Sequence, residues 1–217
     1  MIPEHNPPGA SFALLSSGAS FSCDVLQALN RHRYRPELLV LPEYPPAPKS
    51  AHSARDILGA SPQRRLLTLA AGIDIAYAPA QRQVECARLI ERRAIDFLLV
   101  ACWPYLIESS LIESARKDAL NLHPSLLPRF RGPDPIGEQL AAGDSEFGVS
   151  LHRLNQRFDQ GDIIAQQALS DPGVNPERST LEKRCARLGV ELFIDAVTRF
   201  PAWNPIEQAC QTLEADW

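Results

Sequence analysis

Short apolar runs alternate along this chain with longer stretches in which apolar residues recur at helical spacing. The short runs, rich in branched and aromatic side chains, predict strands at Phe12–Leu15, Leu38–Leu41, Asp74–Tyr77 and Phe97–Ala101. The longer stretches predict helices at Cys23–Arg31, Arg64–Ala71 and Gln81–Arg92. Strands that alternate with helices pair in parallel, and the continuous apolar run FLLVA is typical of a strand covered on both faces. The pattern predicts an α/β chain with a doubly wound, mostly parallel sheet and helices on both faces.

Three stretches depart from this alternation. Pro42–Ser53 is rich in proline and has no period, which favours a surface loop over a proline-rich recognition motif. Phe147–Leu154 alternates in polarity, and Gly161–Leu169 is followed by the breaker SDPG. We expect these last two stretches to be strands near an edge of the sheet, where the pairing turns mixed.

A long closing helix is predicted at the C-terminal end. Apolar residues fall at helical spacing from Pro176 to Phe200, with Asn175 as the expected cap and Pro176 in the first turn. Residues 1–200 are expected to form one domain. Pro201–Trp217 is too short for a second domain, so we expect it to pack back on the sheet or to fray.

Composition and charge narrow the classes of function. The chain has 217 residues, 45% of them hydrophobic and 22% charged, which suits one large globular domain. Its formal net charge of −4 gives no basic footprint, so a nucleic-acid partner is not expected. No apolar stretch approaches ~20 residues and no signal peptide is evident, so we expect a cytoplasmic protein without a membrane partner.

The cysteines indicate neither disulfides nor a metal site. They are few and widely separated, and no CxxC pair or histidine stands at a metal-ligand spacing. They are Cys23, Cys86, Cys102, Cys185 and Cys210. We expect five reduced thiols and no metal, and for Cys102 a role as buried filler is favoured over a reactive one.

The chemistry is concentrated between Asn121 and Gln166. Asn121 and His123 are two residues apart at the end of an apolar strand, so their side chains project to the same side. The prolines that follow hold the backbone out of a helix, and Gly132 lets it turn. Asp159 lies in a turn-prone segment just before a new strand, where its carboxylate can reach an imidazole. These side chains form a candidate site.

The segments NLHPSLLPRFRG and GVSLHRLNQRFDQGDIIAQ resemble the folate-dependent formyltransferase family. That family includes methionyl-tRNA formyltransferase, glycinamide ribonucleotide transformylase and sugar N-formyltransferases, and the resemblance spans roughly Phe12 to Leu169. It implies a Rossmann-like formyltransferase fold. It also implies that Asn121, His123 and Asp159 are the catalytic residues and that 10-formyltetrahydrofolate is the co-substrate.

These residue types suit formyl transfer. Attack of an amine on the formyl group builds negative charge on the formyl oxygen, which the side-chain NH₂ of Asn121 and a protonated His123 can stabilise. Asp159 beside His123 favours the imidazolium and can accept a proton from the amine. Taken singly, His123 and Asp159 suit a structural histidine and a turn residue, but together in this motif they favour catalysis.

The resemblance also assigns binding residues. The segment VACWPYLI implies a pterin pocket, with a wall opposite it, built from Trp103, Tyr105, Leu106, Ile107, Asn155, Gln156 and Phe158. Aromatic side chains at a strand end also serve as plain core filler, which is the alternative for Trp103 and Tyr105.

Acceptor binding is expected at Ser17, Arg131 and His152. The serines of Ser16–Ser22 either cap the next helix or help it hold an anion, and this turn lacks the glycine-rich motifs of the tRNA and ribonucleotide enzymes. His152 lies either near the cleft, as in sugar N-formyltransferases, or on a strand surface. Phe147 replaces a threonine that the family often has there.

We therefore expect an N-formyltransferase that transfers the formyl group to the primary amine of a small molecule, with an amino sugar as the leading candidate. The alternatives are a formyltetrahydrofolate hydrolase, a methionyl-tRNA or glycinamide ribonucleotide formyltransferase, and a folate-binding module without catalysis. Acidic residues in the last 48 positions argue against a tRNA-binding appendage. A homodimer is left open.

Overall fold

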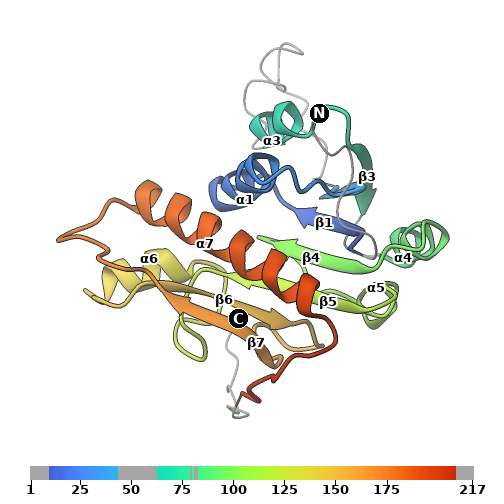
Figure 1. Cartoon of the computed structure of the whole chain (residues 1–217). Helices are drawn as coiled ribbons and strands as arrows, with labels where there is room; N and C mark the ends of the chain where they lie inside the picture. The colour runs from blue at the N-terminus through green and yellow to red at the C-terminus, as the bar shows by residue number, and fades with distance from the viewer. Residues whose placement is uncertain (1–9, 44–62, 79, 81–82, 209–217) are drawn as a thin grey trace.

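The computed structural model describes residues 10–43, 63–78, 80 and 83–208. Its strands form one sheet in the order β3-β2-β1-β4-β5-β6-β7 (Figure 1). The strands are β1 (Phe12–Ser16), β2 (Leu38–Pro42), β3 (Asp74–Ala78), β4 (Phe97–Ala101), β5 (Asp118–His123), β6 (Gly148–Arg153) and β7 (Ile163–Ala168). The helices are α1 (Ser20–Arg31), α3 (Gln63–Leu69), α4 (Gln83–Arg92), α5 (Ser109–Ile112), α6 (Pro135–Ala141) and α7 (Arg178–Arg199). The strands from β3 to β5 pair in parallel, and β6 and β7 continue the sheet as antiparallel strands, which confirms the predicted mixed α/β sheet.

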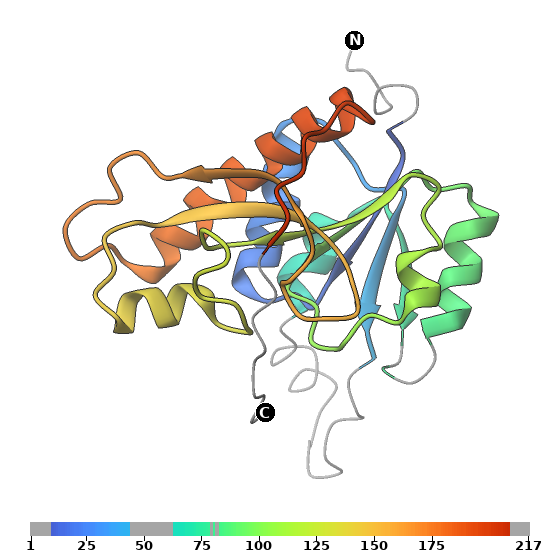
Figure 2. The same ribbon diagram turned by 90° about the horizontal axis from the view of Figure 1, so that it is seen from below.

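Helices cover both faces of the sheet. Successive residues of a strand point to opposite faces, so each strand contributes side chains to a core on either side. Phe12 and Leu14 of β1 belong to a core cluster that includes residues of α1 and α7. Ala13 and Leu15 belong to a second cluster that includes residues of α4 and α5. Figure 2 shows α1 and α7 on one side of the sheet and α4 and α5 on the other. Every residue of β4 is buried, as the run FLLVA predicts for a central strand.

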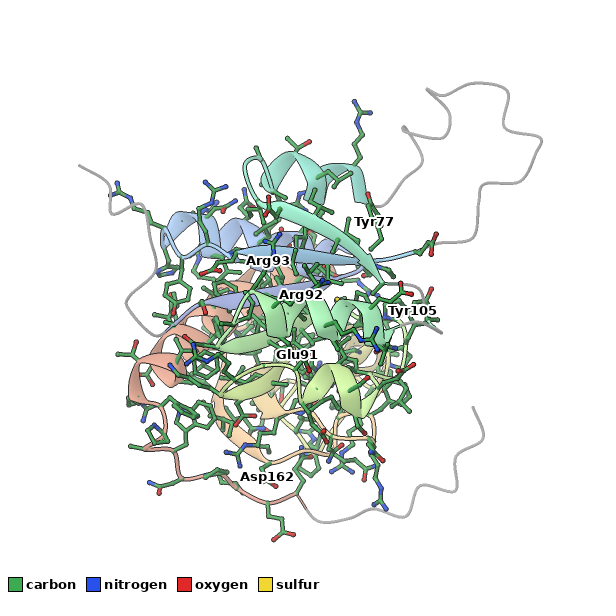
Figure 3. All side chains as sticks on the ribbon, turned by 90° about the vertical axis from the view of Figure 1, so that its right-hand side faces the viewer. Tyr77, Glu91, Arg92, Arg93, Tyr105 and Asp162 are labelled. Atoms are coloured by element: carbon green, nitrogen blue, oxygen red, sulfur yellow. The ribbon has the colours of Figure 1, made fainter. Side chains whose placement is uncertain are left out.

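The helical spacing read from the sequence corresponds to real amphipathic faces. In α4, Cys86 and Ile90 are buried against the sheet. Glu91 and Arg92 of the same helix are exposed, and their side chains extend from its outer face in Figure 3. A helix with one apolar stripe on the core and polar residues facing water is the arrangement that the spacing predicts.

The predicted start of the long C-terminal helix was wrong by two residues. Helix α7 begins at Arg178 with Glu177 as its N-cap, so Asn175 is not the cap and Pro176 precedes the first turn. Asn175 has a φ of 52°, in the left-handed region, and turns the chain before the helix. Ion pairs of Arg178 with Asp134 and with Glu182 fix the first turn of the helix.

The described part of the C-terminal tail packs back on the fold. Ile206 and Ile163 exchange two backbone hydrogen bonds of 2.9 Å, so the tail pairs with the first residue of β7. Trp203 donates its Nε1–H to Ala196 O of α7 at 2.8 Å. Residues 209–217, with Cys210, lie outside the described residues, as does the predicted proline-rich loop beyond Glu43.

The four described cysteines are free thiols, as expected. Burial raises the pKa of Cys86 to about 11 and the pKa values of Cys102 and Cys185 to about 12. A thiol with so high a pKa is a poor nucleophile at neutral pH. Cys102 packs against the core cluster of α1 and α7 but is only partly buried, so it is not the fully buried filler that was expected. Within the described ranges, no three His, Cys, Asp or Glu side chains form a group suited to a metal ion. No described helix has the length and apolar character that a membrane crossing requires.

Candidate active site

Strand pairing assembles the predicted site and adds a second histidine to it. Asn121 and His123 lie on β5, and the antiparallel register places Asn121 opposite His152 of β6. Asp159 comes from the loop between β6 and β7, and its carboxylate meets both β5 side chains. The three residues expected to be catalytic therefore converge, although they come from two separate segments of the chain.

The Asp159 carboxylate is held from several directions. Its Oδ2 accepts a hydrogen bond from the backbone N–H of Gly132 at 3.0 Å. Its Oδ1 accepts one from Asn121 Nδ2 at 3.3 Å and lies 3.4 Å from His123 Nδ1. Burial raises the pKa of Asp159, but the electrostatic effect of the neighbouring His123 and the contacts with His152 and Gly132 outweigh burial and leave the pKa at about 2. The carboxylate is therefore ionised at neutral pH.

His123 is 4% exposed and has an acceptor at each ring nitrogen. Its Nε2 lies 2.7 Å from Phe130 O, and a carbonyl only accepts, so Nε2 carries the proton of the neutral ring. Burial lowers the pKa of His123, against the opposing effects of Asp159 and Phe130 O. The neutral ring thus presents an unprotonated Nδ1 beside a carboxylate. A proton that arrives there converts the contact with Asp159 into an ion pair.

His152 fixes the orientation of Asn121. His152 Nδ1 lies 2.8 Å from Arg153 O, which assigns the ring proton to Nδ1 and leaves Nε2 as an acceptor. Asn121 Nδ2 donates to that nitrogen at 3.0 Å and to Asp159 at 3.3 Å. Each amide hydrogen of Asn121 thus points at an acceptor. His152, which is 1% exposed, supports the site from within the protein.

A cavity of about 1210 Å³ opens beside these residues. Its lining includes Asn121, His123 and Asp159, but His152 is not among the described residues that line it. The loop after β4, the start of α1, the turn before α6, the loop between β6 and β7 and the first residues of α7 also contribute to the wall. This location, beyond the carboxyl ends of β1, β4 and β5, is where doubly wound sheets bind ligands.

Most of the residues expected to bind the pterin line this cavity. They are Trp103, Tyr105, Leu106, Ile107, Asn155 and Phe158. Phe158 is 57% exposed, which is unusual for a phenylalanine and leaves its ring available to a ligand. Trp103 Nε1 is buried and has no hydrogen-bond partner among the described residues. Gln156, by contrast, is not among the lining residues, and its side chain is hydrogen-bonded to Ser109 of α5.

Of the three residues expected to bind the acceptor, two line the cavity and one does not. Ser17 lines the cavity, and its Oγ accepts a hydrogen bond from Ala19 N at 3.3 Å. Of the two roles left open for the serines, capping of α1 is not observed, because the N-cap is Ala19 and no side chain of the described residues caps it. Arg131 also lines the cavity, while its Nη2 donates to Gln208 Oε1 at 2.7 Å. His152 lies behind Asn121 rather than in the wall.

The sequence reasoning missed a charged cluster in the cavity wall. Arg178 of α7 donates to both oxygens of Asp134, at 2.7 and 3.0 Å, and its Nε donates to Glu182 at 2.9 Å. Glu182 is 7% exposed, so this carboxylate is held in place by its arginine. The spacing of Arg178 and Glu182, one helical turn apart, is visible in the sequence, but the partnership with Asp134 depends on the tertiary fold.

Comparison with known proteins identifies the family. The profile of the formyl transferase family matches residues 14–197. Methionyl-tRNA formyltransferase of Rickettsia massiliae is 30% identical over 136 residues, which are 61% of this chain and 44% of that protein. This chain thus spans about half the length of the curated relatives it matches.

Solved structures share the fold. Phosphoribosylglycinamide formyltransferase of Bacillus halodurans superimposes with a TM-score of 0.64 at 22% identity, covering 87% of this chain and 94% of that one. A proposed sugar N-formyltransferase of Mycobacterium tuberculosis gives a TM-score of 0.58 at 17% identity, covering 93% and 72%. With most of its length matched by the family profile and its fold shared with these enzymes, the chain belongs to the formyl transferase family of folate-dependent enzymes.

Proposed function

We propose that this protein transfers a formyl group from 10-formyltetrahydrofolate to the primary amine of a small polar molecule, with amino sugars as the leading class. The observation that carries the proposal is the convergence of three side chains on the wall of one large cavity, where Asn121 and His123 each lie within hydrogen-bond or ion-pair distance of Asp159. An amide donor, an imidazole and an ionised carboxylate are the groups that acyl transfer to an amine requires.

The cavity suits a reduced folate. It is larger than most small-molecule sites, and the aromatic and aliphatic side chains after β4 provide flat apolar contacts. The buried Nε1–H of Trp103, which has no partner in the part of the chain that the structure describes, is a donor that a bound ligand would satisfy. In this proposal Trp103, Leu106, Ile107 and Phe158 hold the pterin end. The bound folate supplies an electrophilic formyl carbon.

Asn121 stabilises the charge that develops on the formyl oxygen, and His123 adds to this stabilisation once it has become protonated. Of the two contacts of Asn121 Nδ2, the one to Asp159 is the longer, at 3.3 Å against 3.0 Å to His152, so we expect the developing oxyanion to replace Asp159 as the acceptor. A preorganised donor of this kind is typically worth ~2.7–4 kcal/mol, or roughly 10²–10³ in rate.

Proton transfer uses His123 and Asp159. Because burial favours the neutral imidazole, His123 Nδ1 accepts the proton that the amine loses as its nitrogen bonds to the formyl carbon. Asp159, at 3.4 Å, stabilises the resulting imidazolium. His123 then returns the proton to the departing folate nitrogen as the old carbon–nitrogen bond breaks. Protons and electron pairs balance over these two steps.

Further polar groups in the cavity wall support a small acceptor. The uncapped start of α1 offers backbone N–H groups, and the cluster of Asp134, Arg178 and Glu182 offers acceptors and donors for hydroxyl groups. In the described residues, Arg178 is already paired with carboxylates and Arg131 with Gln208, which favours a compact polar substrate over a nucleic-acid backbone. The similarity to methionyl-tRNA formyltransferases makes methionyl-tRNA the second candidate.

Release of tetrahydrofolate on mixing with 10-formyltetrahydrofolate and each candidate acceptor tests the proposal. The panel contains amino sugars, small amines, glycinamide ribonucleotide and methionyl-tRNA, and a reaction without acceptor measures hydrolysis. Asn121→Ala, His123→Ala and Asp159→Asn are each expected to fold and to lose activity by roughly 10² or more. Salt-sensitive formylation of methionyl-tRNA alone would replace the amino-sugar assignment. Full activity of folded His123→Ala would refute the mechanism.

A further inference from the structure

The C-terminal segment that follows α7 reaches the loops that carry two cavity-lining residues, Asp159 and Arg131. It pairs with the start of β7 through Ile206 and Ile163, and two residues later Gln208 is 8% exposed, between the loops that carry Asp159 and Arg131. Burial of a glutamine to this degree is unusual, because glutamine side chains are mostly exposed.

Both the NH₂ group and the oxygen of the Gln208 amide have hydrogen-bond partners. Its Nε2 donates to Gly161 O at 2.6 Å and to Asp159 O at 3.1 Å. Its Oε1 accepts from Arg131 Nη2 at 2.7 Å. Two donors beside one acceptor belong to a primary amide, so neither a carboxylate nor an apolar side chain can replace this set of contacts.

The two loops that Gln208 joins are those that meet at the catalytic carboxylate. Gly132, next to Arg131, donates its N–H to Asp159 Oδ2 at 3.0 Å. Asp159 has a φ of 53°, in the left-handed region, and this conformation persists only where the surroundings hold it. Gln208 supplies such a hold, because it bonds the carbonyl of Asp159 itself.

We propose that Gln208 is a positioning residue for catalysis, which keeps the Asp159 loop and the Arg131 loop at the separation at which the Asp159 carboxylate contacts His123 and Asn121. This inference rests on the proposed function for its kinetic consequences, but its structural consequence is independent of the acceptor. It assigns the C-terminal segment to the active-site scaffold rather than to a dispensable tail.

Two variants separate the contacts of Gln208. Gln208→Met keeps an unbranched side chain of similar volume and loses all three hydrogen bonds. Gln208→Glu keeps the acceptor that faces Arg131 and loses both donors to the loop carbonyls. Ile206→Ala is the matched control, because the side chain of Ile206 is 65% exposed and its pairing with Ile163 uses only backbone atoms.

Steady-state kinetics and folate binding give the first readout. Both Gln208 variants are expected to lower kcat by about tenfold or more, since a displacement of about 1 Å in a catalytic group costs up to roughly 10² in rate. Their affinity for a stable reduced-folate analogue, measured by calorimetry, should stay within a factor of about two of the wild type. Ile206→Ala should match the wild type in both. A purely structural role predicts instead a lower melting temperature with an unchanged kcat in the folded fraction.

The second readout does not depend on activity. NMR titration of the His123 imidazole in Gln208→Met should show protonation at a lower pH than in the wild type, because a displaced Asp159 no longer favours the imidazolium. This shift is expected even if the wild type formylates none of the tested acceptors, which would refute the proposed function alone. If Gln208→Met does not fold, the kcat of Gln208→Glu decides. Wild-type kcat in the folded Gln208 variants, or an unshifted His123 titration, would overturn the inference.

Discussion

Asn121 of β5 and His152 of β6 stand opposite each other in the sheet, with Asn121 Nδ2 3.0 Å from His152 Nε2. The hydrogen bond from His152 Nδ1 to Arg153 O leaves His152 Nε2 free to accept this contact. His152 therefore determines which way the Asn121 amide faces, although His152 is itself outside the cavity wall.

Replacing His152 by alanine should lower kcat and leave KM for both substrates nearly unchanged. The buried Asn121 amide loses its acceptor and its fixed orientation, and we expect a loss of about tenfold or more in kcat. His152→Gln restores an acceptor and should recover part of that loss. Steady-state kinetics on both variants provides the measurement. A rise in KM for the acceptor with an unchanged kcat would instead return His152 to the substrate-binding role that the sequence suggested.

Much of the fold and the centre of the site were predictable, because they depend on local patterns. Runs such as FLLVA mark buried strands, and the short motif that holds Asn121 and His123 keeps two reactive side chains on one side of a strand. Asp159 was identifiable because its turn-prone segment sits before a strand and completes a known motif. The short helices α5 and α6 are too brief to show a clear helical period.

The supporting contacts were not predictable in the same way. The contact between His152 and Asn121 depends on the antiparallel register of β6 on β5. Because a long connection joins these two strands, the sequence alone does not determine that register. Gln208 reaches Arg131 across 77 positions of the chain and Asp159 across 49. No periodicity links residues so far apart, so packing alone brings them together.

Stability should fall with acidity through two identified groups. The folded-state pKa of His123 is lowered from 6.5 by burial, so the unfolded chain binds the extra proton first, and stability is lost as the pH falls below about 6.5. Asp159 has its pKa lowered from 3.8 to about 2, so its contribution is present above pH 3.8 and is lost as the pH falls toward 2.

Urea denaturation of the wild type and of His123→Asn between pH 8 and pH 5 measures the first of these effects. The variant, which has no imidazole to protonate, should lose less of its free energy of unfolding than the wild type over that range. Parallel curves for the two proteins would show that His123 has the same pKa in the folded and unfolded states.

Folate binding should be reported by Trp103 rather than by Trp203. Trp103 lines the cavity, and its Nε1 has no partner among the residues with described positions, whereas Trp203 donates to Ala196 O and packs against Phe200. Titration with a stable reduced-folate analogue should change the tryptophan fluorescence of the wild type and of Trp203→Phe. The change should be largely lost in Trp103→Phe, and calorimetry on Trp103→Ala should show weaker binding. An equal response in Trp103→Phe would place the bound folate elsewhere.

Gly161 should tolerate no side chain, because it lets the Asp159 loop return against β6. A Cβ at Gly161 would clash with Arg153 O, a backbone atom that also accepts the hydrogen bond from His152 Nδ1. Gly161→Ala must therefore displace the Asp159 loop, β6 or both. Such a displacement moves Asp159 away from His123 and also disturbs the hydrogen bond of His152. Gly143 is the matched control. It has a φ of +63°, and a Cβ there would meet no described atom within 4 Å, so Gly143→Ala costs only the left-handed strain of about 1–2 kcal/mol.

We expect Gly143→Ala to lower the melting temperature slightly and to retain the kcat of the wild type. Gly161→Ala should lose at least about tenfold in kcat even at temperatures where circular dichroism shows it folded, since the displaced carboxylate no longer contacts the imidazole. The comparison separates strain in a loop from displacement of a catalytic group. If the two variants lose stability equally and both keep wild-type kcat, the backbone at Gly161 does not position Asp159.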